Sequence, residues 1–363
     1  MAAIAEPVER SPLERSPLGR ISPRQVIMLV VASAVMVAGL FVIAPAVADL
    51  PNVWGELMNG HLGWLAFALV LEILSFVGHA ILFRAVSIDA DGDRSRIGFR
   101  ASTEITLAGH AATRLFASAG AGGIALTAWA LKKSGMEARD VAARMTTFMV
   151  LLYAVYMGAL VVGGLGLYSG VIPGGGSFAM TIVPAIFGAA VIALVATAQL
   201  VKPGESRLRR WLSPVGDGVR SARRLIREGN PGLLGAFMWW AFDIAALWAA
   251  FEAFGAAPAV GILVVGYFVG MLANTLPLPG GVGSVDGGMI GAFVAFGVDP
   301  AAAIVAVLAY RFFAFWLPIA PGALAFGSLR RTVARWEAED AGEAPVRTTA
   351  KRRRRTVLAH QYS

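Results

Sequence analysis

The segment at positions 274–286 combines prolines, glycines and an acidic residue, and its residue types suit a binding site. Pro277 and Pro279 would end one short helix, and the glycines after them allow a tight turn with exposed backbone amides. Such a turn attracts anions, and the phosphodiester of a lipid headgroup is an anion. Asp286 falls in the first turn of the next helix, where it could cap the helix, pair with a cation or bind a proton, and a plain structural cap is the alternative to a site. The candidate substrate-binding residues of this segment are Asn274, Pro279, Gly280, Gly281, Gly283 and Asp286.

An arginine also lies inside a long apolar segment, where an unpaired charge is costly unless it faces protein or water. Arg311 follows Tyr310 in an otherwise uncharged stretch, so we expect an interior partner for it. That partner could be Asp286, Asp243 or a bound phosphate. A purely structural ion pair would explain the arginine equally well. Tyr310, Arg311 and Asp243 are therefore further candidates for substrate binding.

Other charged residues in apolar segments allow similar interpretations. Asp243 and Glu72 could couple to protons or balance charge in a hydrated cavity. Arg114 follows Glu104 in another apolar stretch, and both are candidates either for substrate binding or for a structural pair. His110 could titrate in such a cavity, but a hydrogen-bonded contact between helices is the simpler interpretation.

The sequence contains no familiar set of metal ligands or catalytic groups. It has no cysteine, and its four histidines lack metal-ligand spacing. Asp89, Asp91 and Asp93 form the nearest candidate for a cation site, but Arg94 and Arg96 beside them favour a solvated loop. We therefore expect no cofactor, no metal and no catalytic residues, and we expect that the chain is not an enzyme.

Long apolar helices must position these residues. Of the 363 residues, 57% are hydrophobic and only 15% are charged, which is too little polar surface for a soluble domain. Apolar stretches of about 20 residues predict helices that cross a hydrocarbon layer about 30 Å thick. The predicted fold is all-α, a polytopic membrane bundle of about six full spans with two additional re-entrant hairpins. The predicted spans are 25–47, 62–83, 145–167, 179–201, 232–254 and 301–327.

Positive charge predicts the orientation of these spans. Five clusters, in the two tails and between apolar stretches, contain 29 of the 31 Lys and Arg, and positive residues stay in the cytoplasm. We therefore predict a transmembrane domain at 25–329, with cytoplasmic tails at 1–24 and 330–363, in a bacterial-type inner membrane. The first tail does not have the pattern of a cleaved signal peptide. The pattern of segment 202–229 predicts a basic amphipathic helix on anionic lipid headgroups, and the alternative is a flexible solvated loop. Lipid headgroups are more suitable partners for this charge than nucleic acid.

Two glycine-interrupted stretches, 103–131 and 258–296, are predicted to be re-entrant. The first lies between two basic loops and the second between two loops without Lys or Arg, so each must enter and leave by one face. Each stretch is long enough for two half-helices but not for two full crossings. The two hairpins would therefore enter the membrane from opposite faces.

The glycine pattern repeats within the chain. Gly122 and Gly123 precede an apolar run and a second glycine turn, and Gly281 and Gly283 precede a similar run about 160 residues later. Inverted repeats with broken helices are typical of transporters, whose substrate sites lie near the membrane midplane. Gly122 and Gly123 are therefore candidate substrate-binding residues. The alternative is that glycine is simply common in membrane helices.

Several of these motifs together resemble the lysylphosphatidylglycerol synthase transmembrane region family. The resemblance rests on the run from Pro279 to Asp286, on the turn at Gly297, and on Tyr310 and Arg311 followed by Trp316, Leu317, Pro318 and Gly322. Residues 25–330 fit the span pattern of the family. Asp286 stands where the family usually has Glu, and Thr127 stands where an Arg is common. The first loop also lacks the usual proline before its glycines.

The resemblance implies a bacterial inner-membrane protein that moves a phospholipid or a polyprenyl-phosphate-linked molecule between leaflets. Members are sometimes fused to an aminoacyl-transferase domain, and we predict a stand-alone form here. One alternative is an integral membrane transferase or phosphatase that acts on lipids or glycans, and another is an accessory subunit of a membrane glycosyltransferase. The expected partners are membrane lipids and the lipid substrate, without nucleic acid. A membrane enzyme or a second copy of the chain are further candidates.

Overall fold

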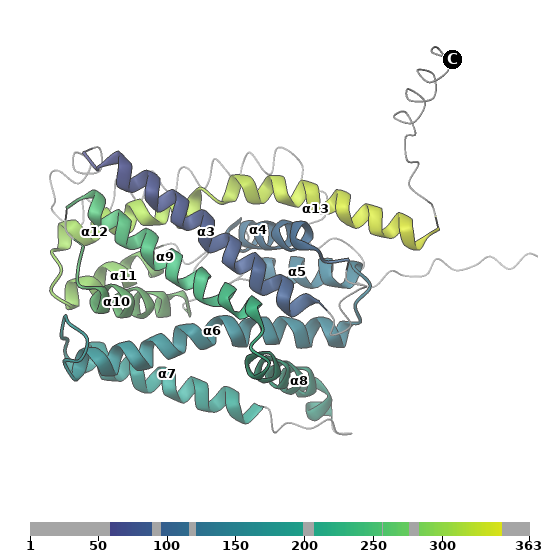
Figure 1. Cartoon of the computed structure of the whole chain (residues 1–363), viewed down its shortest axis with the longest axis horizontal. Helices are drawn as coiled ribbons and strands as arrows, with labels where there is room; N and C mark the ends of the chain where they lie inside the picture. The colour runs from purple at the N-terminus through teal and green to yellow at the C-terminus, as the bar shows by residue number, and fades with distance from the viewer. Residues whose placement is uncertain are drawn as a thin grey trace, which may run out of the picture.

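The structure is a computed structural model that describes residues 59–88, 96–115, 121–198, 207–255, 257–275 and 283–342. Within these ranges every regular element is a helix, as the all-α prediction requires. The predicted tail 1–24, the predicted span 25–47 and the turn residues Pro279, Gly280 and Gly281 lie outside the described ranges. Figure 1 shows the helices packed as an elongated bundle along the long axis of the molecule.

Five helices among the described residues are long and apolar enough to cross a membrane. They coincide with the predicted spans from 62–83 onward, so the prediction of a membrane protein with several apolar helices is confirmed. They are α3 (Leu62–Ser87), α6 (Ala138–Tyr168), α7 (Phe178–Ala198), α9 (Leu234–Ala253, after the 3-10 turn η1, Pro231–Leu233) and a long final run. That run consists of α12 (Pro300–Arg311), a π-helical turn η4 (Phe312–Trp316) and α13 (Ile319–Asp340).

Helix α13 continues well past position 329, where we place the start of a polar tail from the sequence. Leu329, Val333 and Trp336 lie on one face of this extension and are buried. Their spacing of three and four residues is that of an apolar stripe on a helix. The extension is therefore helical because it packs along α4 (Phe99–Leu115), which a count of charges alone does not reveal.

Two pairs of shorter helices occupy opposite halves of the bundle. Helices α4 and α5 (Ala121–Lys133) lie in the half that contains α8 (Arg207–Arg227). Helices α10 (Val260–Leu272, followed by the 3-10 turn η2, Ala273–Thr275) and α11 (Ser284–Ala295) lie in the other half (Figure 1). Gly283 has φ of 80° at the start of α11, a conformation that favours glycine.

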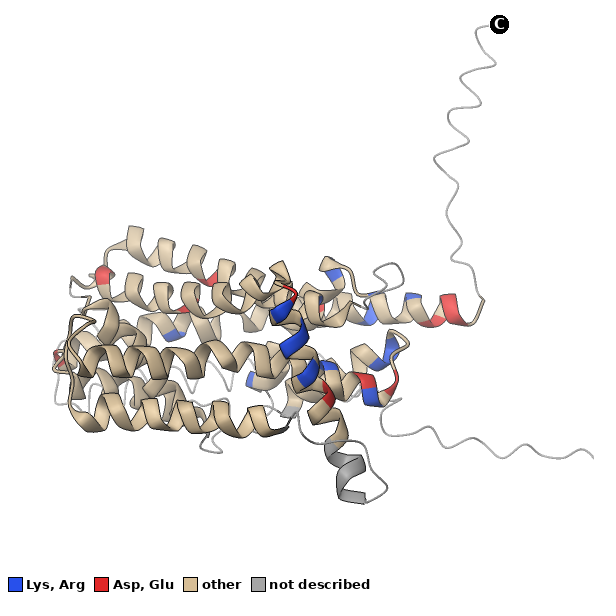
Figure 2. Cartoon of the chain, turned by 60° about the horizontal axis from the view of Figure 1, so that its bottom comes forward, with Lys and Arg blue, Asp and Glu red and all other residues tan. Residues whose placement is uncertain are grey.

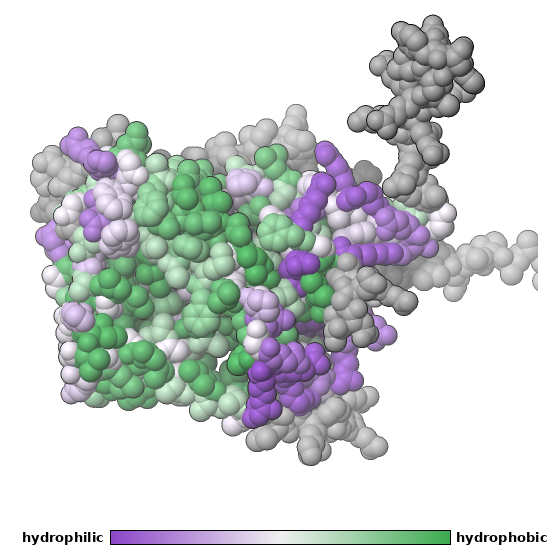
Figure 3. Space-filling view, viewed as in Figure 1, coloured by the Kyte–Doolittle hydropathy of each residue, from purple (hydrophilic) through white to green (hydrophobic). Residues whose placement is uncertain are grey.

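Lys and Arg gather at the end of the bundle where α8 lies, as Figure 2 shows. We call this the basic end, and most of the remaining surface in Figure 3 is hydrophobic. Asp217 of α8 accepts hydrogen bonds from Arg139 at 2.8 Å and Arg220 at 2.5 Å. Partial burial raises the pKa of Asp217, but these hydrogen bonds outweigh it and hold the pKa below its usual value. Asp217 therefore stays charged and fastens α8 to the start of α6. The basic end includes Arg139 and Arg220, which bond Asp217 of α8, and Arg84, which lines a surface hollow together with Arg224 of α8.

Helices α3 and α9 pack closely where Gly78 meets Gly235. A Cβ added to Gly78 would lie 2.5 Å from Met238 Cβ and 2.9 Å from the Gly235 carbonyl oxygen, which is closer than real contacts allow. Ser75 also donates to the Trp239 carbonyl at 2.9 Å. This contact brings the acidic residues of the two helices together inside the bundle.

We expect Gly78→Ala to lower the stability of the protein by about 1–3 kcal/mol, because the added methyl group must push the helices apart. Gly158→Ala is the matched control, since a Cβ there would meet nothing within 4 Å. Thermal unfolding of the two purified variants in detergent measures the difference. Equal unfolding temperatures would contradict the close packing of α3 and α9.

Candidate functional site

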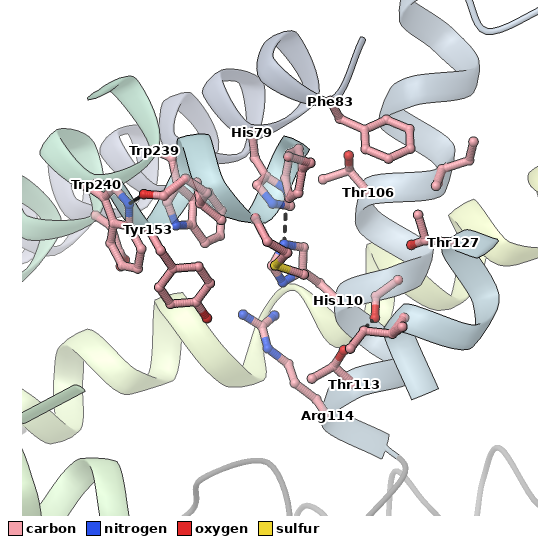
Figure 4. A pocket seen from close by; sticks show the side chains of 18 of the residues that line it. His79, Phe83, Thr106, His110, Thr113, Arg114, Thr127, Tyr153, Trp239 and Trp240 are labelled. Atoms are coloured by element: carbon pink, nitrogen blue, oxygen red, sulfur yellow. Dashed lines mark hydrogen bonds between the residues drawn. The ribbon is translucent and has the colours of Figure 1, made fainter. Parts of the chain in front are cut away.

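A cavity of about 450 Å³ lies inside the bundle, between the two pairs of short helices. Charged and aromatic side chains from several helices line it, and Figure 4 shows part of the wall. The cavity reaches the molecular surface at Ile124 of α5 and at Met149 and Tyr153 of α6, which are 49%, 37% and 43% exposed. The central lining residues are Glu72, His79, His110, Arg114, Trp239, Asp243, Tyr310 and Arg311.

A buried ion pair lies beside the cavity. Arg311 Nε is 2.5 Å from Asp286 Oδ1, and the two side chains are only 10% and 5% exposed. The other oxygen of Asp286 accepts a hydrogen bond from the Gly283 amide at 2.8 Å. Asp286 therefore caps α11 and also provides the interior partner that we expect for Arg311. The Arg311 guanidinium also lies 4.6 Å from the centre of the Phe315 ring.

Asp243 is the centre of a second buried network. It accepts a hydrogen bond from Tyr310 at 2.8 Å and another from Tyr267. Glu72 of α3 lines the same cavity as Asp243, and α3 packs along α9, which carries Asp243. The side chains of Glu72 and Asp243 are 3% and 5% exposed, and Glu72 Oε2 has no hydrogen-bond partner among the described residues. The structure thus places two buried acidic groups at the wall of one cavity.

Arg114 is held differently from Arg311. Its Nη2 donates to the carbonyl of Ala314 at 2.6 Å, and that carbonyl lacks an α-helical donor because Pro318 has no N–H four residues later. Its Nη1 is buried without a hydrogen-bond partner, and none of the described carboxylates forms an ion pair with it. In Figure 4 its guanidinium points from α4 toward Tyr153 and His110. Arg114 therefore presents an unsatisfied donor to the cavity.

A pair of histidines lies above Arg114 against an indole ring. His110 Nε2 is 3.1 Å from His79 Nδ1, and the His110 ring stacks on Trp239 with centroids 5.1 Å apart. His110 thus makes a hydrogen-bonded contact between helices α4 and α3, as the simpler interpretation of the sequence predicts. His79 is absent from the sequence-based candidates, because nothing in its local sequence distinguishes it. The described residues contain no group of three side chains that could hold a metal ion.

Glu104 lies away from the cavity, and Arg114 is not its partner. Its carboxylate accepts hydrogen bonds from Arg100 at 3.0 Å, Ser328 at 2.7 Å and Thr332 at 2.8 Å. It therefore joins α4 to α13 near the basic end, which is a structural role.

The remaining candidates separate into three groups. Gly123 lines the cavity, and a Cβ there would lie 2.6 Å from the Gly109 carbonyl, so its small size allows α4 and α5 to approach. Gly122 and Gly283 do not line the cavity. Pro279, Gly280 and Gly281 lie outside the described residues. The candidates that line the cavity are Arg114, Gly123, Asp243, Asn274, Tyr310 and Arg311.

Tyr267 is a member of the site that the sequence does not reveal. Tyr267 is fully buried, and its hydroxyl is the only polar side-chain group in α10. A tyrosine in such a helix is a weak signal, because aromatic residues are common there. Trp239 and Trp240 are similar cases, since tryptophan usually suggests an interface anchor.

Comparison with known proteins agrees with this architecture. A family model described as "Lysylphosphatidylglycerol synthase TM region" matches residues 26–322, which is well over half of the chain. A "UPF0104 membrane protein" of Methanothermobacter thermautotrophicus is 25% identical over 341 residues. That alignment covers 83% of this chain and 95% of the archaeal protein.

We expect Asp286→Ala to destabilise the protein by about 3–5 kcal/mol, because it leaves the buried charge of Arg311 without a partner. The double variant Asp286→Ala, Arg311→Met removes both charges and should recover part of that loss. Thermal unfolding in detergent of the wild type and both variants provides the measurement. If Asp286→Ala is as stable as the wild type, Asp286 is not the partner that neutralises Arg311.

Proposed function

The chain belongs to the lysylphosphatidylglycerol synthase transmembrane region family, and we propose that it moves a lipid between the two leaflets of a membrane. The substrate is a phospholipid or a molecule linked to a polyprenyl phosphate. Its polar headgroup passes through the cavity while its hydrocarbon chains stay in lipid. The observation that carries this proposal is the buried, unsatisfied Nη1 of Arg114 in a cavity that opens on an apolar surface.

The donor of Arg114 suits a phosphate. A guanidinium buried in a membrane protein is costly unless an interior group satisfies it, and the described residues satisfy only one of its terminal nitrogens. A phosphate oxygen would accept a charge-assisted hydrogen bond from the free Nη1 of Arg114. Arg311 is less suitable as an anchor, because Asp286 already neutralises it. We therefore assign headgroup binding to Arg114, and support of the cavity wall to Arg311.

The apolar edge of the cavity suits the hydrocarbon chains. Ile124, Met149 and Tyr153 form this edge, which we call the α5–α6 opening. A headgroup that enters between α5 and α6 can leave its chains outside the bundle, in contact with lipid. The lipid then avoids transfer of its long apolar chains through a polar path.

The arrangement of short helices supports an inverted repeat. We propose six full spans, with α4–α5 and α10–α11 as re-entrant hairpins from opposite faces, since the two pairs occupy opposite halves of the bundle. Irregular backbone within a membrane must face protein or water, and the cavity between the pairs meets that need. We further propose that the basic end faces the cytoplasm with both termini, in a bacterial-type inner membrane.

We propose a transporter and not an enzyme. In the described cavity wall, no serine, threonine or carboxylate forms a hydrogen bond with the histidine pair, which could otherwise activate it as a nucleophile. Mass spectrometry of lipids incubated with the protein separates the two activities. A new lipid product would support the membrane transferase or phosphatase.

We expect Arg114→Gln to slow lipid movement about tenfold or more, because one hydrogen bond between charged groups is lost. The assay uses vesicles that contain the protein and fluorescent phosphatidylglycerol, with an impermeant quencher that reads the outer leaflet. Arg330→Gln is the control, because Arg330 is exposed on α13 and does not line the cavity. Equal rates of lipid movement for Arg114→Gln and the wild type would contradict the assignment of headgroup binding to Arg114.

The absence of cysteine allows a test of the α5–α6 opening. We expect a bulky maleimide on Tyr153→Cys to reduce lipid movement about tenfold, because the adduct blocks the edge of the cavity. Ile186→Cys is the matched control, since Ile186 is 60% exposed on α7 and is not part of the cavity. Similar inhibition at the two sites, measured in the same vesicle assay, would argue against entry between α5 and α6.

A further inference from the structure

Glu72 and Asp243 are two buried acids in the wall of one cavity, and together they require a proton. Two ionised carboxylates are acceptors only, so they cannot form a hydrogen bond with each other. They also repel strongly where water is scarce, and both side chains are at most 5% exposed. Neither carboxyl forms an ion pair among the described residues, so burial of both in the ionised form would be costly, and at least one of them carries a proton.

The neighbouring donors distinguish the two members of the pair. Asp243 accepts hydrogen bonds from Tyr267 and Tyr310, which favours its charged form. Glu72 has no such donor, and its Oε2 has no partner among the described residues. Glu72 is therefore the member that holds the proton, although the pair titrates as a unit.

The charges around the pair are nearly balanced. The groups that face it include Arg114 and Arg311, whose charges act on Glu72 and Asp243, and Asp286 neutralises Arg311. With one shared proton the carboxyl pair carries one negative charge, and Arg114 carries one positive charge. The titratable and charged groups around the cavity are His79 of α3, His110 and Arg114 of α4, Arg144 and Tyr153 of α6, Tyr267 of α10, Asp286 of α11, and Tyr310 and Arg311 of α12.

An anionic headgroup would disturb this balance. A phosphate bound to Arg114 takes over the positive charge that matches the carboxyl pair. The remaining negative charge of the pair would then be unmatched in a poorly hydrated site, where uncompensated charge is costly. Uptake of a second proton by the pair restores neutrality.

We infer that Glu72 and Asp243 form a proton-binding site, and that one proton crosses the membrane with each anionic headgroup. This inference rests on the proposed function. A proton from water on one side forms an O–H bond with a carboxylate oxygen of the pair, and the same bond breaks when the proton returns to water on the other side. No other reactant is consumed. Headgroup and proton together are neutral when they pass, so the pH difference across the membrane drives the lipid.

The test uses phosphatidylcholine vesicles with the full-length protein, fluorescent phosphatidylglycerol and an imposed pH difference. Labelled lipid should accumulate in the leaflet that faces the alkaline side, with a rate that changes by up to about tenfold per pH unit. Glu72→Gln keeps the size of the side chain but cannot bind or release a proton. We expect this variant to lose the directional response to the pH difference.

Glu252→Gln is the matched control, because Glu252 is on the same helix as Asp243 but does not line the cavity. It should respond to the pH difference as the wild type does. Wild-type protein that moves lipid equally in both directions under a pH difference overturns the inference while the proposed function stands. A Glu72→Gln variant with the full directional response also overturns it.

Infrared spectroscopy tests the proton site without any lipid movement. The purified wild type should show the carbonyl absorption of a protonated carboxylic acid near neutral pH, and Glu72→Gln should lose it while Glu252→Gln retains it. Absence of this absorption from the wild type overturns the proton site. If the wild type shows the absorption but moves no lipid, the proposed function fails together with the coupling, and the proton site stands.

Discussion

Charge inside a membrane helix bundle must be neutralised within the bundle, and the Asp286–Arg311 pair is the contact that meets this requirement at the centre of the protein. Asp286 also closes the first turn of α11 through the Gly283 amide, so one carboxylate holds a helix start and a buried cation at once. The pair joins α11 to α12, and α12 packs on α9, which carries Asp243. The walls of the cavity therefore depend on a short contact between two charged groups.

The two buried arginines have different partners, which suits Arg311 to support of the cavity wall and Arg114 to ligand binding. Arg311 is matched by a carboxylate, whereas Arg114 rests on a backbone carbonyl that Pro318 deprives of its usual donor. A charge with a permanent partner belongs to a fixed part of the wall, because breaking the ion pair would leave an uncompensated charge buried in the protein. A partly matched charge is suited to a ligand that arrives and leaves. The same distinction applies to the acids, because Asp286 forms an ion pair with Arg311, whereas Glu72 forms no ion pair among the described residues.

The sequence predicts the spans and the need of Arg311 for a partner, because both follow from the cost of exposing polar groups to lipid. It does not predict which distant residues meet. Tyr267 and His79 lie in mostly apolar helices whose rotation is set by packing between helices, and the single sequence shows no periodicity that reveals that rotation. Glu104 shows the same limit: its spacing from Arg114 suggests a shared site, but the fold turns it toward Ser328 and Thr332 of α13.

The π-helical turn at Phe312–Trp316 has a mechanical consequence. One extra residue in a turn rotates everything after it by about 100° around the helix axis. In the run from Pro300 to Asp340, the part before the turn therefore packs on α9 and α11, and the part after it packs on α4 with a different face. Since α12 carries Arg311 and α13 packs on α4, this turn sets the angle at which the two halves of the molecule meet.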